Sequence, residues 1–347
     1  MNQLTVPENA KAAYTTRHLR FETIDGIITE GRPVAGDLVL ARVAEIGQHQ
    51  RLELCDGRRA TLYEGDPIIV TYANRYAPDQ FEAVVPDDLG PCHLAAAGGV
   101  AAQTLSQHAA MLNPTCLEPV GLLSDASGRR VNLRDWRLPD PSVTSPSPHT
   151  IVVVGTAMNA GKTTAAAGII RGLTLAGCRV GAAKITGTGA GGDVWLMTDA
   201  GATPVLDFTA AGFASTYRCT DDEVLDSLRI LHGHLASTEP DVIVLEIADG
   251  LLQRETAALL ATCEMREVAD AFVFAAGDAM GAVNGVAALR TLGLPVVAVS
   301  GLLTASPLAT REARDALDVP VFTLEELFDA PASIRPSART HLVSAAR

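Results

Sequence analysis

The second half of the sequence alternates short apolar runs with longer stretches of helical pattern. The apolar runs lie at residues 150–154, 179–185, 241–247, 271–275 and 295–299. Runs that are apolar on both faces are typical of parallel strands buried between helices, and the stretches between them supply those helices. The pattern predicts an α/β fold over residues 150–330, with a doubly wound, mostly parallel sheet.

The first half has a different pattern, in which the candidate strands are shorter and separated by turn residues. These strands lie at residues 37–44, 50–54, 59–63 and 66–72. Their spacing is typical of a small barrel or sandwich. We therefore expect a smaller β-rich N-terminal domain over residues 1–137, which also contains a short helical stretch at residues 99–111.

The two halves meet at residues 138–149, where four prolines stand among serines and threonines. This composition predicts a stiff, polar linker and places the domain boundary there. At the far end of the chain, we expect residues 331–347 to form a loose tail.

A glycine-containing segment follows the first apolar run of the second half. It reads Gly155-Thr-Ala-Met-Asn-Ala-Gly161-Lys162-Thr163-Thr164 and leads into an alanine-rich helical stretch. Glycines let backbone N–H groups turn toward phosphate oxygens, and the positive end of the helix adds to the attraction. In this context the segment predicts a phosphate-binding P-loop, with Lys162 on the β- and γ-phosphates and the Thr163 hydroxyl on Mg²⁺. The residues expected to bind the nucleotide are Gly155, Thr156, Asn159, Ala160, Gly161, Lys162, Thr163 and Thr164.

Lysine is rare in this chain, which has three lysines and 24 arginines. Lys162 and Lys184 both stand beside glycine-rich turns that follow expected strands. A compact point charge suits phosphate oxygens in a tight backbone loop. We therefore interpret Lys184 as a second catalytic lysine; codon bias and chance are the alternative for this residue.

Three acidic residues are candidate Mg²⁺ ligands, because Mg²⁺ prefers carboxylate oxygens. Glu246 ends an apolar run, at the sheet edge where open α/β folds bind ligands, and it is also a candidate catalytic residue. Asp249 stands in the turn that follows, and Asp193 follows the glycines at residues 187–192. The alternatives are a helix N-cap or an ion pair for Glu246, and an N-cap for Asp193.

Four more residues are candidates for contact with a substrate. Thr186 and Gly187 belong to the turn after Lys184, Asp207 lies in a polar segment at residues 206–218, and Arg254 follows the acidic turn. An exposed connection explains the polar segment equally well, and a solvated helix start explains Arg254.

The second half resembles the dethiobiotin-synthetase-like family of P-loop NTPases over residues 150–325. The likeness lies in the longer loop from Gly155 to Thr164, in Lys184 at the end of the second strand, and in the strand that ends in Glu246. It implies that Lys184 faces the phosphates and the substrate. Ala157 and the turn Ile247-Ala-Asp249 depart from the family pattern, which argues against dethiobiotin synthesis itself. The same half is also similar to the P-loop half of a family of D-glutamate N-acetyltransferases, in which the loop is implied to serve acetyl-CoA.

Charge and cysteine usage narrow the set of partners. The formal net charge is −13, which argues against nucleic acid or an anionic membrane as the main partner. Six scattered cysteines without a CxxC pair, and an N-terminus without an apolar run, predict a cytoplasmic protein with reduced thiols. The expected partner is a small-molecule substrate, and a homodimer stays open.

The sequence thus favours an ATP-dependent enzyme that uses Mg²⁺ to transfer a phosphoryl group to a small acidic metabolite. Ligation of the phosphorylated product is a further step that the family resemblance implies, and it stays open. ATP is preferred to GTP because the chain has no N-K-x-D motif. One alternative is an N-acyltransferase whose P-loop binds acetyl-CoA without Mg²⁺. The other is a nucleotide-switched binding protein, which is disfavoured because the loop lacks the early lysine of dimerising members of that class.

Overall fold

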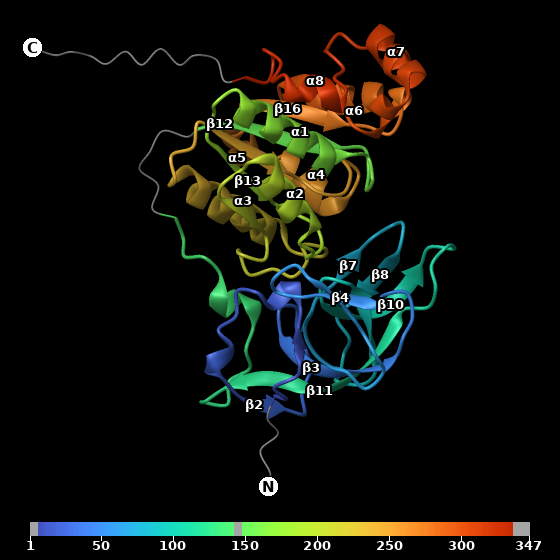
Figure 1. Ribbon diagram of the computed structural model, residues 1–347, viewed down its shortest axis with the longest axis vertical. Helices are drawn as coiled ribbons and strands as arrows, with labels where there is room; N and C mark the ends of the chain where they lie inside the picture. Colours follow the sequence, from blue (N-terminus) through green and yellow to red (C-terminus); the bar gives the residue numbers. More distant parts are fainter. Residues whose placement is uncertain (1–5, 142–147, 336–347) are drawn as a thin grey trace, which may run out of the picture.

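A computed structural model describes residues 6–141 and 148–335 of the chain. It is built of two parts, a β-rich N-terminal part and a C-terminal part with a parallel sheet, which lie one below the other in Figure 1. Residues 142–147 of the expected linker and residues 336–347 of the expected tail lie outside the described residues.

The C-terminal part is a six-stranded sheet in which every neighbouring pair is parallel. Its strands, from one edge to the other, are β14 (Val205–Asp207), β13 (Val180–Lys184), β15 (Val242–Glu246), β12 (His149–Gly155), β16 (Ala271–Ala275) and β17 (Val296–Ser300). This confirms the predicted α/β fold. The three-residue strand β14 was not predicted, because its sequence lies within a segment that has a polar pattern.

Helices cover both faces of this sheet. One face packs against α1 (Lys162–Leu175), α2 (Gly192–Ala200) and α8 (Leu324–Phe328). The other packs against α3 (Asp221–Ala236), α4 (Arg254–Leu260), α5 (Cys263–Val268), α6 (Ala279–Thr291) and α7 (Pro307–Ala316). The sheet is therefore doubly wound, and its strands are apolar on both sides because both sides are buried.

The N-terminal part contains a ring of five strands that closes on itself. In the ring, β6 (Pro67–Tyr72) pairs with β3 (Leu38–Glu45), then β11 (Thr115–Asp125), β9 (Cys92–Ala96) and β10 (Val100–Gln107), which pairs with β6 again. Apolar side chains such as Val70, Leu94 and Leu117 fill one core of this part. The predicted small barrel or sandwich is therefore a closed barrel, a form that leaves the ring without an open edge.

Shorter elements surround the barrel and the parallel sheet. The additional strands are β1 (Lys11–Ala12), β2 (Ile24–Ile28), β4 (Arg51–Glu53), β5 (Arg59–Thr61), β7 (Arg75–Tyr76) and β8 (Phe81–Val84). The 3-10 helices are η1 (Tyr14–Thr16), η2 (Phe21–Thr23), η3 (Leu133–Trp136) and η4 (Leu302–Ala305).

Two expectations about local structure were wrong. Residues 99–111 are not helical, because Val100–Gln107 form β10, which pairs with β6, β8 and β9. Strand pairing on this scale overrides the helix propensity of the alanines. Nor are residues 331–335 loose, since Ile334 is 1% exposed and packs in the core beside α1.

Within the described part of the chain, no helix is both long enough and apolar enough to cross a membrane.

Candidate nucleotide-binding site

The phosphate loop runs from the end of β12 to the start of α1. Gly161 precedes α1 with φ +91°, and a Cβ there would lie 2.9 Å from the backbone nitrogen of Leu302, so glycine is required on both counts. The loop is anchored by the Leu302 N–H, which donates to the Ala160 carbonyl at 2.9 Å. Strand, loop and helix therefore form a P-loop at the carboxyl edge of a parallel sheet.

Lys162 lies inside this loop with only 6% of its surface exposed. Its Nζ donates a hydrogen bond to the Ala157 carbonyl of the same loop at 2.8 Å. Burial lowers the pKa of Lys162, while Glu246 and Asp249 oppose that shift. The ammonium is thus held at the centre of the loop by a neutral acceptor, which phosphate oxygens can replace.

Thr163 and Glu246 face each other at the base of the loop. The Thr163 hydroxyl donates to Glu246 Oε1 at 3.0 Å, because Glu246 ends β15 beside Val153 of β12. Glu246 is 1% exposed, its Oε2 has no hydrogen-bond partner among the described residues, and burial raises its pKa. A buried carboxylate oxygen without a partner beside a loop hydroxyl fits Mg²⁺, which binds one or two protein oxygens together with phosphates.

No cluster of three or more His, Cys, Asp or Glu side chains suited to a metal ion occurs among residues 6–141 and 148–335. A Mg²⁺ ion at Thr163 and Glu246 would therefore depend on phosphate oxygens for much of its coordination.

Lys184 joins the acidic residues of the site. It stands beside Glu246 in the sheet register, forms an ion pair with Asp193, and its Nζ lies 3.9 Å from Glu246 Oε1. Burial opposes the charge of Lys184, but Asp193 and Glu246 outweigh this effect and raise its pKa. Asp193 lies in the first turn of α2, whose N-cap is Gly191, so it is not the N-cap.

Asp249 lies in the turn after β15 with φ +64°, a backbone conformation that aspartate tolerates better than most residues. Burial raises the pKa of its carboxyl to about 6, although Lys162 and Lys184 lower it. Asp249 is thus a weaker acid than an exposed aspartate, and it lies within electrostatic reach of Lys162 and Lys184.

These side chains line a cavity of about 950 Å³ between the two parts of the molecule. The C-terminal wall carries the predicted residues Asn159, Gly161, Lys162, Thr163, Thr164, Lys184, Gly187, Asp193, Glu246 and Asp249. The N-terminal wall comes from the loops and short strands that surround the barrel, and it includes Gln48, His49, Arg51, Arg59, Arg75 and Gln80. No motif marks the barrel residues in the sequence, because only the packing of the two parts brings them to the P-loop.

Four of the predicted residues support the cavity without lining it. Gly155 and Thr156 pack against β16, where the Thr156 N–H donates to the Ala275 carbonyl at 3.0 Å. Ala160 accepts the bond from Leu302 described above, and the buried hydroxyl of Thr186 accepts from the Ala248 N–H at 2.9 Å. They shape the loop and the turns on which the lining residues stand.

Asp207 does not line the cavity, contrary to its interpretation as a substrate contact. It ends β14, is 1% exposed, and accepts hydrogen bonds from Tyr14 Oη and Arg17 Nη2, both at 2.7 Å. Burial opposes its charge, but Arg17 and Thr209 keep the pKa of Asp207 below its usual value. The residue joins the N-terminal segment to the parallel sheet.

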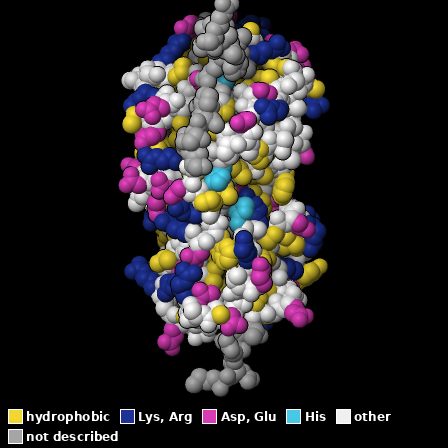
Figure 2. All heavy atoms as spheres, turned by 90° about the vertical axis from the view of Figure 1, so that its left-hand side faces the viewer, with side chains coloured by type: hydrophobic (Ala, Val, Ile, Leu, Met, Phe, Trp, Pro, Cys, Tyr) yellow, Lys and Arg dark blue, Asp and Glu magenta, His cyan; other side chains and the backbone are white. Residues whose placement is uncertain are grey.

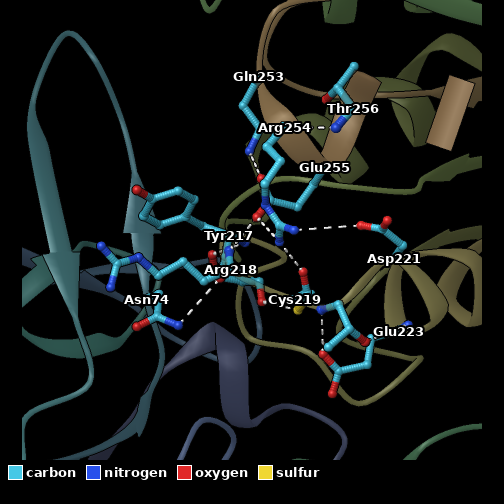
Figure 3. Close-up of polar contacts among 12 residues, drawn as sticks. Asn74, Tyr217, Arg218, Cys219, Asp221, Glu223, Gln253, Arg254, Glu255 and Thr256 are labelled. Atoms are coloured by element: carbon cyan, nitrogen blue, oxygen red, sulfur yellow. Dashed lines mark hydrogen bonds and ion pairs between the residues drawn. The ribbon is translucent and has the colours of Figure 1, made fainter. Parts of the chain in front are cut away.

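Arg254, the first residue of α4, does not line the cavity either. Figure 3 shows its contacts with neighbouring residues. Its Nη2 donates to the Cys219 carbonyl at 2.6 Å and pairs with Glu255 at 2.9 Å. Glu255 in turn accepts from the Arg218 N–H at 2.7 Å. In this network Arg254 fixes the segment before α3, and Thr216 of that segment donates its N–H to the Gly187 carbonyl at 2.9 Å. The polar segment at residues 206–218 therefore braces the site.

Charged side chains of both signs are interspersed over the face of the molecule drawn in Figure 2. Among the described residues visible in that view, no broad area of one sign gathers.

Comparison with known proteins gives only distant similarity. No family model matches the chain, and no curated protein matches it. Among solved structures, the signal recognition particle receptor FtsY from Elizabethkingia anophelis is 18% identical with a TM-score of 0.37, over 60% of this chain and 76% of that one. The 54 kDa signal recognition particle protein from Aeropyrum pernix K1, in complex with GDP, is 18% identical with a TM-score of 0.38, over 54% and 44%.

Proposed function

We propose that this protein is a Mg²⁺-dependent P-loop enzyme that transfers the terminal phosphoryl group of a nucleotide, with ATP as the expected nucleotide, to a small acidic acceptor. One observation carries the proposal: Lys162, the Thr163–Glu246 pair with its unpartnered carboxylate oxygen, and Lys184 all lie on one wall of a single cavity. This is the set of groups that phosphoryl transfer requires, because its catalysis is mostly positioning and charge stabilisation.

The proposed role of each residue follows from its position in the cavity. Lys162 and the loop N–H groups hold the β- and γ-phosphates, and Thr163 with Glu246 would hold Mg²⁺, which when bound neutralises phosphate charge. Lys184 stabilises negative charge on the group in transit. Asp249, with a pKa of about 6, is ionised at neutral pH and can accept a proton from the attacking oxygen of the acceptor.

The acceptor occupies the part of the cavity in front of the barrel. Three of the residues that line it from the N-terminal part are arginines, Arg51, Arg59 and Arg75, and one is an acid, Glu53. This wall supports an acceptor that carries negative charge. At about 950 Å³ the cavity lies at the upper end of the range for ligand pockets, roughly 300 to 1,000 Å³, which favours a nucleotide together with a second small molecule.

The first test is thermal unfolding with Mg-ATP, Mg-GTP and acetyl-CoA in parallel. A nucleotide at about 100 times its Kd should raise the melting temperature by several degrees, because it stabilises the folded state by roughly 2.7 kcal/mol. Lys162→Ala should lose that rise, and Glu246→Gln should lose the part that depends on Mg²⁺. Arg171→Ala, on the exposed side of the same helix, is the matched control and should keep both.

The other outcomes decide between the alternatives. A Lys162-dependent rise with acetyl-CoA alone, without Mg²⁺, would replace this proposal with an N-acyltransferase. Nucleotide binding that persists in Lys162→Ala would overturn the assignment of the site.

A nucleotide-switched binding protein is the second candidate, and one contact favours it. Asn159 of the phosphate loop has φ +64° and donates from Nδ2 to Asp79 Oδ2 of the barrel part at 2.8 Å, so the occupied loop can act directly on the barrel. The two proposals differ in turnover. A switch would change its conformation with the nucleotide and show no acceptor-dependent hydrolysis or transfer, whereas the enzyme would form a phosphorylated acceptor.

A further inference from the structure

Arg75, the first residue of β7, is a buried cation without an ion-pair partner. It lines the cavity and is 5% exposed, yet no carboxylate lies within 4.0 Å of its guanidinium nitrogens among residues 6–141 and 148–335. Its Nε has no hydrogen-bond partner among these residues. The negative charge of Asp79 favours the charged form of Arg75 from beyond ion-pair distance. Asp79 Oδ2 accepts a hydrogen bond from Asn159 Nδ2. A buried charge without a counter-charge in direct contact lowers the stability of the folded protein, and a ligand that supplies such a contact would offset that cost.

Neutral groups hold the guanidinium in place. Arg75 Nη2 donates to Gln80 Oε1 at 2.8 Å. Arg75 Nη1 lies 3.2 Å from His49 Nε2, a nitrogen that also lies 3.1 Å from the Ala95 carbonyl oxygen. His49 is fixed in turn by an edge contact with the ring of Phe81, at 5.8 Å between centroids. Burial and Arg75 lower the pKa of His49 to about 4, so the imidazole is neutral at physiological pH. The wall thus orients Arg75 through neutral side chains, and the nearest acid that acts on it, Asp79, stands beyond ion-pair distance.

We infer that Arg75 is the anchor for a carboxylate of the second substrate, a small acid held against the barrel wall opposite the phosphate loop. This inference rests on the proposed function and deepens it. A planar guanidinium with fixed orientation binds carboxylates in a bidentate manner, and burial strengthens the pair. The phosphates of the nucleotide have their own ligands on the other wall, in Lys162, the loop N–H groups and the start of α1.

Direct binding of small acids tests the assignment. Succinate, glutarate and malate are titrated calorimetrically into the full-length protein, with succinamide as the uncharged comparison. Wild type should bind at least one of the acids, and it should bind it in preference to succinamide. Arg75→Gln should weaken that binding by roughly 10- to 100-fold, the range for a lost hydrogen bond to a charged group. Arg58→Gln, an exposed arginine near the same wall that does not line the cavity, should bind as wild type does.

A separate titration with Mg-ATP and Mg-GTP separates this inference from the proposed function. Arg75→Gln should keep nucleotide affinity, and Lys162→Ala should keep affinity for the acid. Loss of acid binding only in Arg75→Gln supports the inference even where no nucleotide binds and the proposed function fails. Loss of nucleotide affinity in Arg75→Gln with acid binding intact would show that Arg75 contacts a phosphate, and would overturn it.

Arg75→Lys keeps the result decisive if Arg75→Gln does not fold. Lysine retains the charge but loses the planar fork, so affinity for the acid should still fall, by a smaller factor. An acid affinity equal to wild type in the folded variant would overturn the assignment, as would wild type that binds none of the three acids at millimolar concentration.

Discussion

At the scale of single residues, the site is a set of buried charges that partly balance one another. Lys184 is neutralised by Asp193 and lies 3.9 Å from Glu246, while Lys162 is held by a backbone carbonyl. Glu246 keeps one carboxylate oxygen without a partner among the described residues. In the absence of a ligand this arrangement lowers the stability of the folded protein, because burying a charge or polar group costs free energy unless the group is paired. A nucleotide with Mg²⁺ would complete the pairing.

Asp249 allows this loss of stability to be tested, because the charge of its carboxyl depends on pH. Burial raises the pKa of Asp249 to about 6, above the value of about 3.9 for an unfolded chain. The folded protein therefore loses stability at this residue as the pH rises from about 4 through 6, and the loss is complete above that range. Asp249→Asn, which also tolerates the positive φ, should raise the free energy of unfolding at pH 7.5 by on the order of 1 to 2 kcal/mol.

Urea unfolding of the ligand-free protein at pH 7.5 and pH 4 measures this difference, which should vanish at the lower pH. Asp318→Asn is the control, because the exposed Asp318 pairs with Arg290 and its pKa is lowered by that hydrogen bond. Neutralising Asp318 should not stabilise the protein at any pH. A destabilised Asp249→Asn at pH 7.5 would show that the ionised carboxylate is well paired in the folded state.

At the scale of elements, a glycine with positive φ stands on each side of α1. Only one of the two positions has other atoms close to where a Cβ would lie. Gly161 before the helix has φ +91°, and Gly177 after it has φ +88°. A Cβ at Gly161 would meet backbone atoms of Gly301 and Leu302, whereas one at Gly177 would meet nothing within 4 Å. The two positions thus share a backbone conformation and differ in steric surroundings.

The pair of variants Gly161→Ala and Gly177→Ala separates these effects. Gly177→Ala should cost about 1 to 2 kcal/mol of stability, the cost of the left-handed conformation alone. Gly161→Ala should cost more, because η4 must also move, and it alone should abolish nucleotide-dependent stabilisation. Thermal unfolding with and without Mg-nucleotide measures both. Equal losses of stability in the two variants would mean that η4 can move away from the phosphate loop without loss of stability.

The sequence was sufficient to predict those elements that depend on residues adjacent in the chain. The apolar runs and the segment Gly155–Thr164 predicted the parallel sheet and the P-loop, because strand burial and phosphate loops depend on adjacent residues. It was not sufficient for β10, whose small residues form a strand only because β6, β8 and β9 pair with it. Nor could it place Asp207, since its partners Tyr14 and Arg17 lie far away in the chain. For the same reason it could not assign Arg75 to the wall of a cavity.

At the scale of the whole molecule, the N-terminal part and the parallel sheet are joined by buried charge. Arg17 stacks on the Tyr14 ring at 3.9 Å from its centroid and pairs with Asp207 at 2.7 Å. Gly191 at the start of α2 donates its N–H to Glu53 of β4 at 3.1 Å, beside the cavity. These contacts set how the wall of the barrel faces the phosphate loop, so the geometry of the cavity depends on them.

Arg17→Met tests this junction, because it keeps the apolar stem and removes the charge. It leaves Asp207 buried without its cation, which should cost about 3 kcal/mol or more of stability at neutral pH. In wild type, the lowered pKa of Asp207 gives stability that is present above its unfolded pKa and is lost as the pH falls through the folded one. In the variant, burial should raise that pKa, so the destabilisation should shrink in acid, where Asp207 binds a proton. Urea unfolding from pH 4 to pH 8 follows the change.

Two comparisons make the result specific to the buried pair. Arg32→Met breaks the exposed pair with Asp87, whose side chains are 74% and 85% exposed, and should cost less than about 1 kcal/mol. Adding Asp207→Asn to Arg17→Met should restore part of the lost stability, since it removes the unpaired charge. If the double variant is no more stable than Arg17→Met alone, packing rather than charge joins the two parts. The cavity between them would then depend on shape and not on this ion pair.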